Sequence, residues 1–104
     1  MDKDQVMESA FEIVSFSGDA KSAAMEAIKI AKSGDINSAR QKLDEAKNTV
    51  ANAHHLQTDL ISAEANGVDI PFSIVVIHGQ DHLMTAMSVI DLAEEFIDVY
   101  EKIN

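Results

Sequence analysis

The stretch INSARQKLDEAKNTVANAHHLQTDL, residues 36–60, repeats its apolar positions every seven residues. An apolar seam with this spacing predicts an α-helix that packs lengthwise against other helices. Alanine at several of these positions allows neighbouring helices to approach closely. One row of the heptad holds Ile36, Leu43, Val50 and Gln57, and the other holds Ala39, Ala46, Ala53 and Leu60.

Two breaks flank this helix and divide the chain into three stretches of similar length. Gly34 ends the first stretch, and the Asp35 carboxylate can cap the second. Gly67 ends the second stretch, and Pro71 stands near the start of the third. Because both connections are short, we expect an all-α, antiparallel three-helix bundle forming a single domain over residues 1–104. Ser17-Gly18 predicts a kink or short break inside the first helix.

Composition excludes several classes of function. The 104 residues include no Cys, so disulfides, thiolate metal sites and cysteine nucleophiles are ruled out. A net charge of −10 argues against nucleic acid and anionic membranes as partners. No apolar run is long enough for membrane insertion, and the first residues do not resemble a signal peptide. We therefore expect a soluble, cytoplasmic protein.

The apolar residues of the third stretch fall into two stripes roughly 100° apart around a helix. We expect the first stripe to face the interior of the bundle. The second stripe would then not be buried within one chain and is a candidate subunit interface. The alternative is that this helix buries a wide part of its surface, including both stripes, in its own bundle. The first comprises Val75, His82, Ala86, Val89, Ala93, Phe96 and Tyr100; the second comprises Ile74, His78, Asp81, Thr85, Leu92 and Val99.

Polar groups concentrate in one motif of this helix, His78-Gly79-Gln80-Asp81-His82. His78 is the candidate nucleophile, since a neutral imidazole can attack phosphorus and later release the group. Gly79 removes a side chain beside it, which would let a partner protein approach the ring. Gln80 and His82 are candidates for orienting the imidazole or for hydrogen bonding to a phosphoryl oxygen.

Asp81 lies on the second stripe, where burial without a partner would be costly. If that stripe meets its copies at a three-fold axis, three Asp81 carboxylates would repel, and a hard cation such as Mg²⁺ would neutralise them. The simpler alternative is a partly exposed Asp beside a His. A zinc site built on His78 and His82 is also conceivable, although it needs a third ligand. His54 and His55 are expected to be solvated.

The segment Val76-Ile77-His78-Gly79-Gln80-Asp81-His82-Leu83-Met84 resembles the IIA component of the lactose/cellobiose (N,N'-diacetylchitobiose) family of the phosphoenolpyruvate-dependent sugar phosphotransferase system. The resemblance continues at Phe11-Glu12-Ile13-Val14, Ser17-Gly18-Asp19-Ala20, Ala53-His54, Gln57-Thr58 and Glu64-Ala65. It therefore extends over nearly the whole chain.

This resemblance implies a homotrimer of three-helix bundles, which together form a nine-helix bundle. It implies a phosphotransferase component in which His78 accepts a phosphoryl group from HPr, forms a phosphohistidine intermediate and passes the group to a IIB cysteine. It further implies that Asp81 of all three subunits holds one Mg²⁺ ion. A structural helical oligomer or a metal-binding protein without phosphoryl transfer is the alternative. Which β-linked disaccharide is transported, such as cellobiose or lactose, does not follow from these residues.

Overall fold

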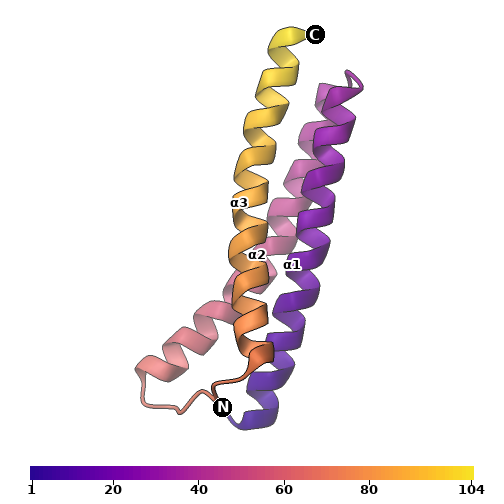
Figure 1. Ribbon diagram of the computed structural model, residues 1–104. Coiled ribbons are helices and arrows are strands. Elements are labelled where there is room, and N and C mark those ends of the chain that lie inside the picture. Colours follow the sequence, from indigo (N-terminus) through magenta and orange to yellow (C-terminus); the bar gives the residue numbers. More distant parts are fainter.

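The computed structural model describes residues 1–104 as three helices, α1 (Lys3–Lys32), α2 (Ile36–Ala65) and α3 (Ile74–Ile103). α1 and α3 run in the same direction and α2 runs in the opposite one, and α1 packs against both of the other helices (Figure 1). The bundle measures 52 × 19 × 17 Å. None of its helices has an apolar segment that would suffice to cross a membrane. The predicted all-α, three-helix architecture is confirmed.

The helix ends follow from local chemistry. The Asp35 side chain accepts a hydrogen bond of 3.1 Å from the backbone N–H of Ser38 and so caps α2. Hydrogen bonding to Ser38 also holds the pKa of Asp35 below its usual value, because it stabilises the carboxylate. Gly34 and Gly67 adopt φ values of 105° and 92°, a region that favours glycine at helix ends. Ser73 caps α3 through its hydroxyl.

The kink expected at Ser17-Gly18 is wrong, because α1 continues without interruption through both residues. Ser17 is fully buried and its neighbours Ile13 and Ala20 belong to the core. A glycine within a helix costs only about 1 kcal/mol relative to alanine. Burial of the apolar stripe of α1 along the whole bundle outweighs that cost.

The core is narrow and rich in alanine. The heptad of α2 is confirmed, since six of its eight positions are buried and Ile36 and Val50 are partly buried. Small side chains dominate one half of the bundle and larger ones the other. The first half contains Ala20, Ala23, Ala24, Ala27, Ala31, Ala39, Leu43, Ala46, Ile90, Ala93 and Ile97; the second contains Val6, Ile13, Ala53, Leu60 and Leu83.

The core-facing stripe of α3 differs from the one expected. Leu83, Ile90 and Ile97 are buried, whereas Phe96 of the predicted stripe is 48% exposed. Around the helix, the buried residues of α3 are centred about 60° from the centre of the predicted stripe. Of the predicted stripe, only Ala86 and Ala93, on the side nearer the buried residues, are fully buried. The six residues of the second stripe are all exposed, as expected for a face that the chain's own helices leave uncovered.

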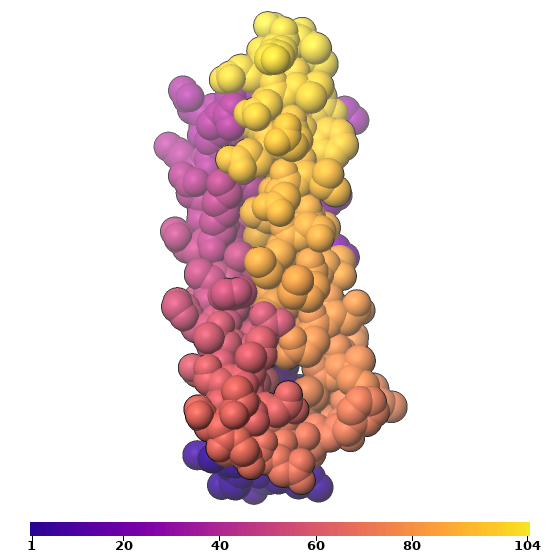
Figure 2. Space-filling view, turned by 90° about the vertical axis from the view of Figure 1, so that its left-hand side faces the viewer, coloured from indigo at the N-terminus to yellow at the C-terminus, as the bar shows by residue number.

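Two acidic side chains of α3, Asp98 and Glu94, form ion pairs with basic side chains of α2. Arg40 of α2 contacts Asp98 at 2.9 Å, and Lys47 contacts Glu94 at 3.2 Å. Figure 2 shows the face on which these two helices lie side by side. The pairing raises the pKa of Arg40, chiefly through its hydrogen bond to Asp98. Because these pairs are exposed, they contribute little to the free energy of folding. They favour this side-by-side alignment of α2 and α3.

The hydroxyl of Ser17 is the one buried side-chain polar atom without a hydrogen-bond partner. Replacing Ser17 by alanine removes this unsatisfied group without creating a clash. We expect the free energy of unfolding of Ser17→Ala to rise by about 1 kcal/mol. Urea denaturation at a fixed protein concentration measures it.

Ser22→Ala, at an exposed position of the same helix, is the matched control and should change stability by no more than about 0.5 kcal/mol. A destabilised Ser17→Ala protein would mean that the hydroxyl has a partner that we have not identified.

Candidate functional site

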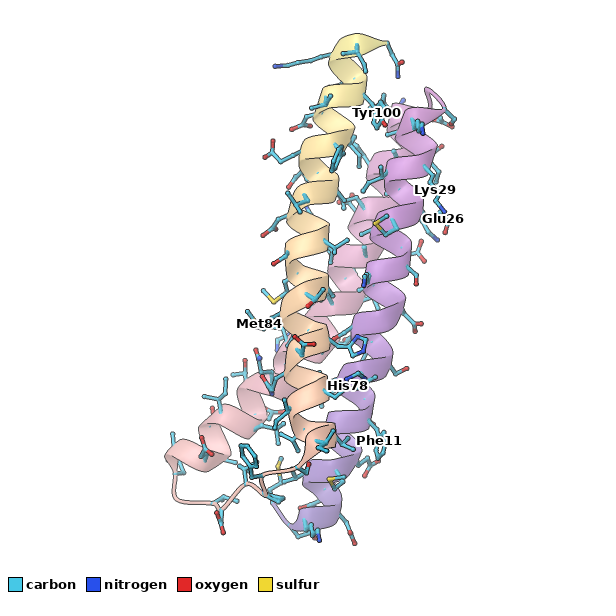
Figure 3. All side chains as sticks on the ribbon, viewed as in Figure 1. Phe11, Glu26, Lys29, His78, Met84 and Tyr100 are labelled. Carbon is cyan, nitrogen blue, oxygen red and sulfur yellow. The ribbon has the colours of Figure 1, made fainter.

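The two histidines of the motif form a perpendicular pair on α3. Their ring centroids are 4.3 Å apart and the ring planes make an angle of 88°. His78 is exposed, whereas His82 is partly buried. Figure 3 shows His78 on the side of α3 that borders α1, close to Phe11, with Met84 pointing away from both. The edge-to-face contact limits rotation of the His78 ring while leaving the ring open to an approaching molecule.

Asp81 is exposed and forms no ion pair within the chain. It lies on the same face of α3 as Ile74 and Leu92, which are 84% and 58% exposed and stand about two and three turns away. No group of three or more His, Asp or Glu side chains within the chain could hold a metal ion. The two imidazoles therefore gain no third ligand for zinc, and Asp81 could form a metal site only with other copies.

Gln80 contacts α2, and its expected role in orienting His78 or in hydrogen bonding to a phosphoryl oxygen stays a prediction. Its Oε1 atom accepts a hydrogen bond from Nε2 of Gln57, a nearly buried residue of α2. The two side chains Gln80 and His78 differ by about 160° in direction around α3, because two helical positions separate them. Gln80 instead joins α3 to α2 in the core, where Gln57 also lies 3.9 Å from the Met84 sulfur.

Gly79 serves the bundle, not the partner protein. It is buried, and a Cβ atom placed there would lie 3.2 Å from the Ala10 carbonyl oxygen and 3.5 Å from Cγ2 of Ile13. The expectation that Gly79 exposes the ring of His78 to a partner is therefore wrong. The missing side chain brings α3 close to α1, and this contact sets the position of the neighbouring His78.

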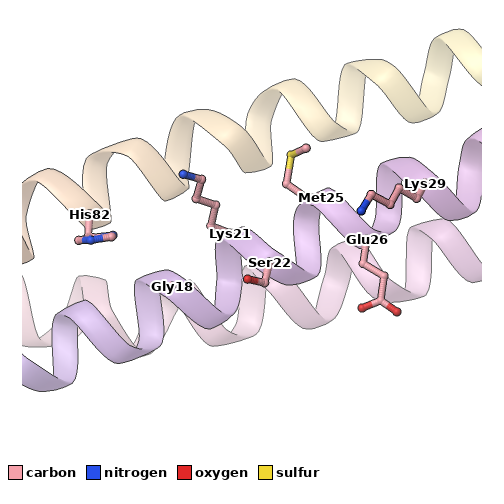
Figure 4. Close-up of a pocket in the computed structure, with 7 residues that line it drawn as sticks. All are labelled: Gly18, Lys21, Ser22, Met25, Glu26, Lys29 and His82. Carbon is pink, nitrogen blue, oxygen red and sulfur yellow. The ribbon is translucent and has the colours of Figure 1, made fainter.

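The structure has a groove between α1 and α3 that was not predicted from the sequence. It has a volume of about 580 Å³, and His82 forms its wall on α3 (Figure 4). Lys21, Met25 and Lys29 of α1 succeed one another at four-residue intervals along the opposite wall. That spacing places all three side chains on one face of a helix, and it was the available signal for the groove.

Comparison with known proteins identifies the family. The family model described as "PTS system, Lactose/Cellobiose specific IIA subunit" matches residues 8–101. The chain belongs to this family. The lactose-specific EIIA component of Staphylococcus epidermidis is 46% identical to this IIA chain over 102 residues, which cover 98% of each protein.

Solved structures agree with this assignment. The cellobiose-specific enzyme IIA of Bacillus anthracis superimposes with a TM-score of 0.92 at 43% identity, covering 99% of this chain and 93% of the other. The chitobiose IIA of Escherichia coli, solved in complex with HPr, gives a TM-score of 0.82 at 36% identity, covering 94% and 95%. The resemblance seen in the sequence is confirmed, and the chain is a phosphocarrier of the sugar phosphotransferase system.

Substituting Gly79 tests the close contact between α1 and α3. The added methyl group of Gly79→Ala must displace the Ala10 carbonyl oxygen by a few tenths of an ångström, whereas Ile13 lies at ordinary contact distance. The resulting strain, about 1–3 kcal/mol, exceeds the gain in helix propensity of about 1 kcal/mol. We therefore expect a net loss of about 1 kcal/mol in urea denaturation.

Gly18→Ala is the matched control, because a Cβ atom at this helical glycine meets nothing within 4 Å. That variant should gain up to about 1 kcal/mol. Equal gains in the two variants would contradict the role assigned to Gly79.

Proposed function

We propose that this IIA chain receives a phosphoryl group from phospho-HPr on His78 and passes it to a cysteine of its IIB partner. The supporting observation is an exposed imidazole, held by a second imidazole at 4.3 Å, on a continuous helix. His54 and His55 are also exposed, but they lie on α2 and outside the motif. The existence of an IIA–HPr complex for a structural relative supports HPr as the donor.

In the proposed reaction a ring nitrogen of neutral His78 attacks phosphorus in line. Its lone pair forms the new N–P bond while the N–P bond to the donor breaks, and the donor imidazole keeps the electron pair. His82 orients the ring through their perpendicular contact. Transfer to the IIB thiolate follows the same course with an S–P bond. Because the phosphoryl group must leave again, the site needs to position it without binding it strongly.

The surroundings of His78 suit exchange between two partners. A side chain that must meet both a donor and an acceptor cannot lie in a deep pocket, and His78 is exposed at the edge of α3. We place the exchange in the cytoplasm, where both partner proteins would meet the carrier. A β-linked disaccharide such as cellobiose or lactose is the proposed transported sugar, since relatives carry lactose-specific and cellobiose-specific names.

Replacing the proposed nucleophile should abolish phosphorylation. His78→Gln keeps a polar side chain of similar size at an exposed position, so the helical content should not change. We expect no mass increase of 80 Da, the approximate mass of a phosphoryl group, when this variant is incubated with phosphoenolpyruvate, enzyme I and HPr.

His54→Gln, which changes an exposed histidine of α2, should accept the phosphoryl group at the wild-type rate. Phosphorylation of the His78→Gln protein at an undiminished rate would show that another residue is the nucleophile.

We further propose that three copies assemble through the exposed face of α3. We call this surface the apolar face; it consists of Ile74, Leu92, Phe96, Val99 and Ile103, which are 48% to 84% exposed. A face of this extent is unusual for a monomeric protein and typical of an interface. Around a three-fold axis, Asp81 of each copy would supply a carboxylate oxygen to one Mg²⁺ ion, which would offset two of the three negative charges.

Asp81→Leu tests this assembly. The substitution removes the repulsion between carboxylates together with the need for a cation, so the variant should remain trimeric in the presence of a chelator. Wild-type protein should dissociate more readily when the chelator is added. Sedimentation velocity over a range of protein concentrations measures both. A variant that sediments only as a monomer would contradict the placement of Asp81 at the axis.

A further inference from the structure

The groove between α1 and α3 carries positive charge that the chain itself does not neutralise. Glu26 also lines the groove, but its carboxylate turns away (Figure 4) and contacts Lys42 of α2 at 3.4 Å. Lys21 and Lys29 take part in no ion pair. Lys21 and Lys29 therefore both face the groove without an acidic partner, and His82 lies at the opposite end of the groove from Lys29 (Figure 4).

This arrangement stands out in a chain of net charge −10. Arg40, Lys42 and Lys47 all contact carboxylates. Lys3, Lys29, Lys32 and Lys102 lie in the first or last turn of a helix, the last three where the helix dipole favours a cation. Lys21 alone has neither a carboxylate nor a helix end. A side chain of this kind is explained most simply by an acidic group from outside the chain.

Unpaired acidic side chains border the apolar face on its other side. Asp91 and Glu95 of α3 are exposed and form no ion pair. Glu95 lies about 40° beyond Val99 around the helix, and Asp91 about 40° further, in the direction away from α1. The apolar face thus has one basic border, at the groove, and one acidic border.

The two borders also lie at similar heights along the bundle. α1 and α3 run in the same direction (Figure 1), and the contact of Gly79 with Ala10 and Ile13 fixes their relative position. With equal rise per residue, Lys29 is level with residues 95–98 of α3, and Lys21 lies slightly below Asp91. Rotation about an axis parallel to the helices leaves these heights unchanged.

We infer that Asp91 and Glu95 of one copy enter the Lys21–Lys29 groove of the next copy in the ring. This inference rests on the three-fold assembly proposed above and names the contacts that close it. In an antiparallel dimer, whose two-fold axis is perpendicular to the helices, like borders would face each other, so complementary borders at equal heights favour assembly about an axis parallel to the helices. His82 lines the same groove at the end nearer Lys21.

Charge reversal tests the contact. Lys29→Glu and Glu95→Lys each place like charges across the proposed interface and should weaken assembly at least about tenfold, more strongly at low salt. The double variant restores opposite charges and should regain most of the wild-type association. Sedimentation velocity at two ionic strengths measures these effects.

Lys32→Glu is the matched control, because it reverses a charge in the same last turn of α1 outside the groove. Its assembly should equal that of the wild type. Single reversals that associate normally, or a double variant no better than the weaker single one, would overturn the inference.

Phosphorylation of the wild-type protein by HPr, assayed separately, distinguishes the two levels of the proposal. If His78 is phosphorylated and the charge reversals have no effect, the inter-copy contact is wrong while the phosphocarrier role of His78 stands. If the wild-type protein is phosphorylated at another residue, the assignment of His78 fails whatever the reversals show. A wild-type protein that is monomeric at every concentration overturns the contact directly.

Discussion

Each helix of a slim three-helix bundle can bury only one stripe of side chains, and α3 carries more apolar surface than one stripe holds. Leu83, Ile90 and Ile97 fill the interior, while Leu92 and Val99 stay in contact with solvent. This limit explains where the two histidines of the motif lie. They occupy the border between the buried stripe and the uncovered one, where a side chain is held by its neighbours and remains accessible.

The bundle itself was largely predictable because its signals are local. The heptad of α2, the cap at Asp35 and the glycines at 34 and 67 each depend on a few neighbouring residues. The unbroken course of α1 through Gly18 was not predictable in this way. Whether a helix continues through a glycine depends on the packing of its buried face, which no short window of sequence contains.

Within the site, the sequence predicted the helix that carries the motif residues better than it predicted the contacts of each residue. His78, Asp81 and His82 lie on one helix, as their spacing predicted, but His82 is only partly buried although its stripe was expected to face the interior. Gly79 was misread because the backbone that it approaches, at Ala10, is distant in the sequence. The core direction of α3 was misjudged by about 60°, since helical periodicity gives relative directions and not the absolute one.

His78 lies in the second turn of a 30-residue helix and not on a loop. A side chain anchored there cannot travel between a donor and an acceptor as a swinging arm would. The donor protein must then bring the phosphoryl group to His78 and dissociate before the acceptor protein binds. The rate of phosphoryl transfer would be limited by the lifetime of these protein complexes. Short lifetimes favour small, weak interfaces on a carrier of this shape.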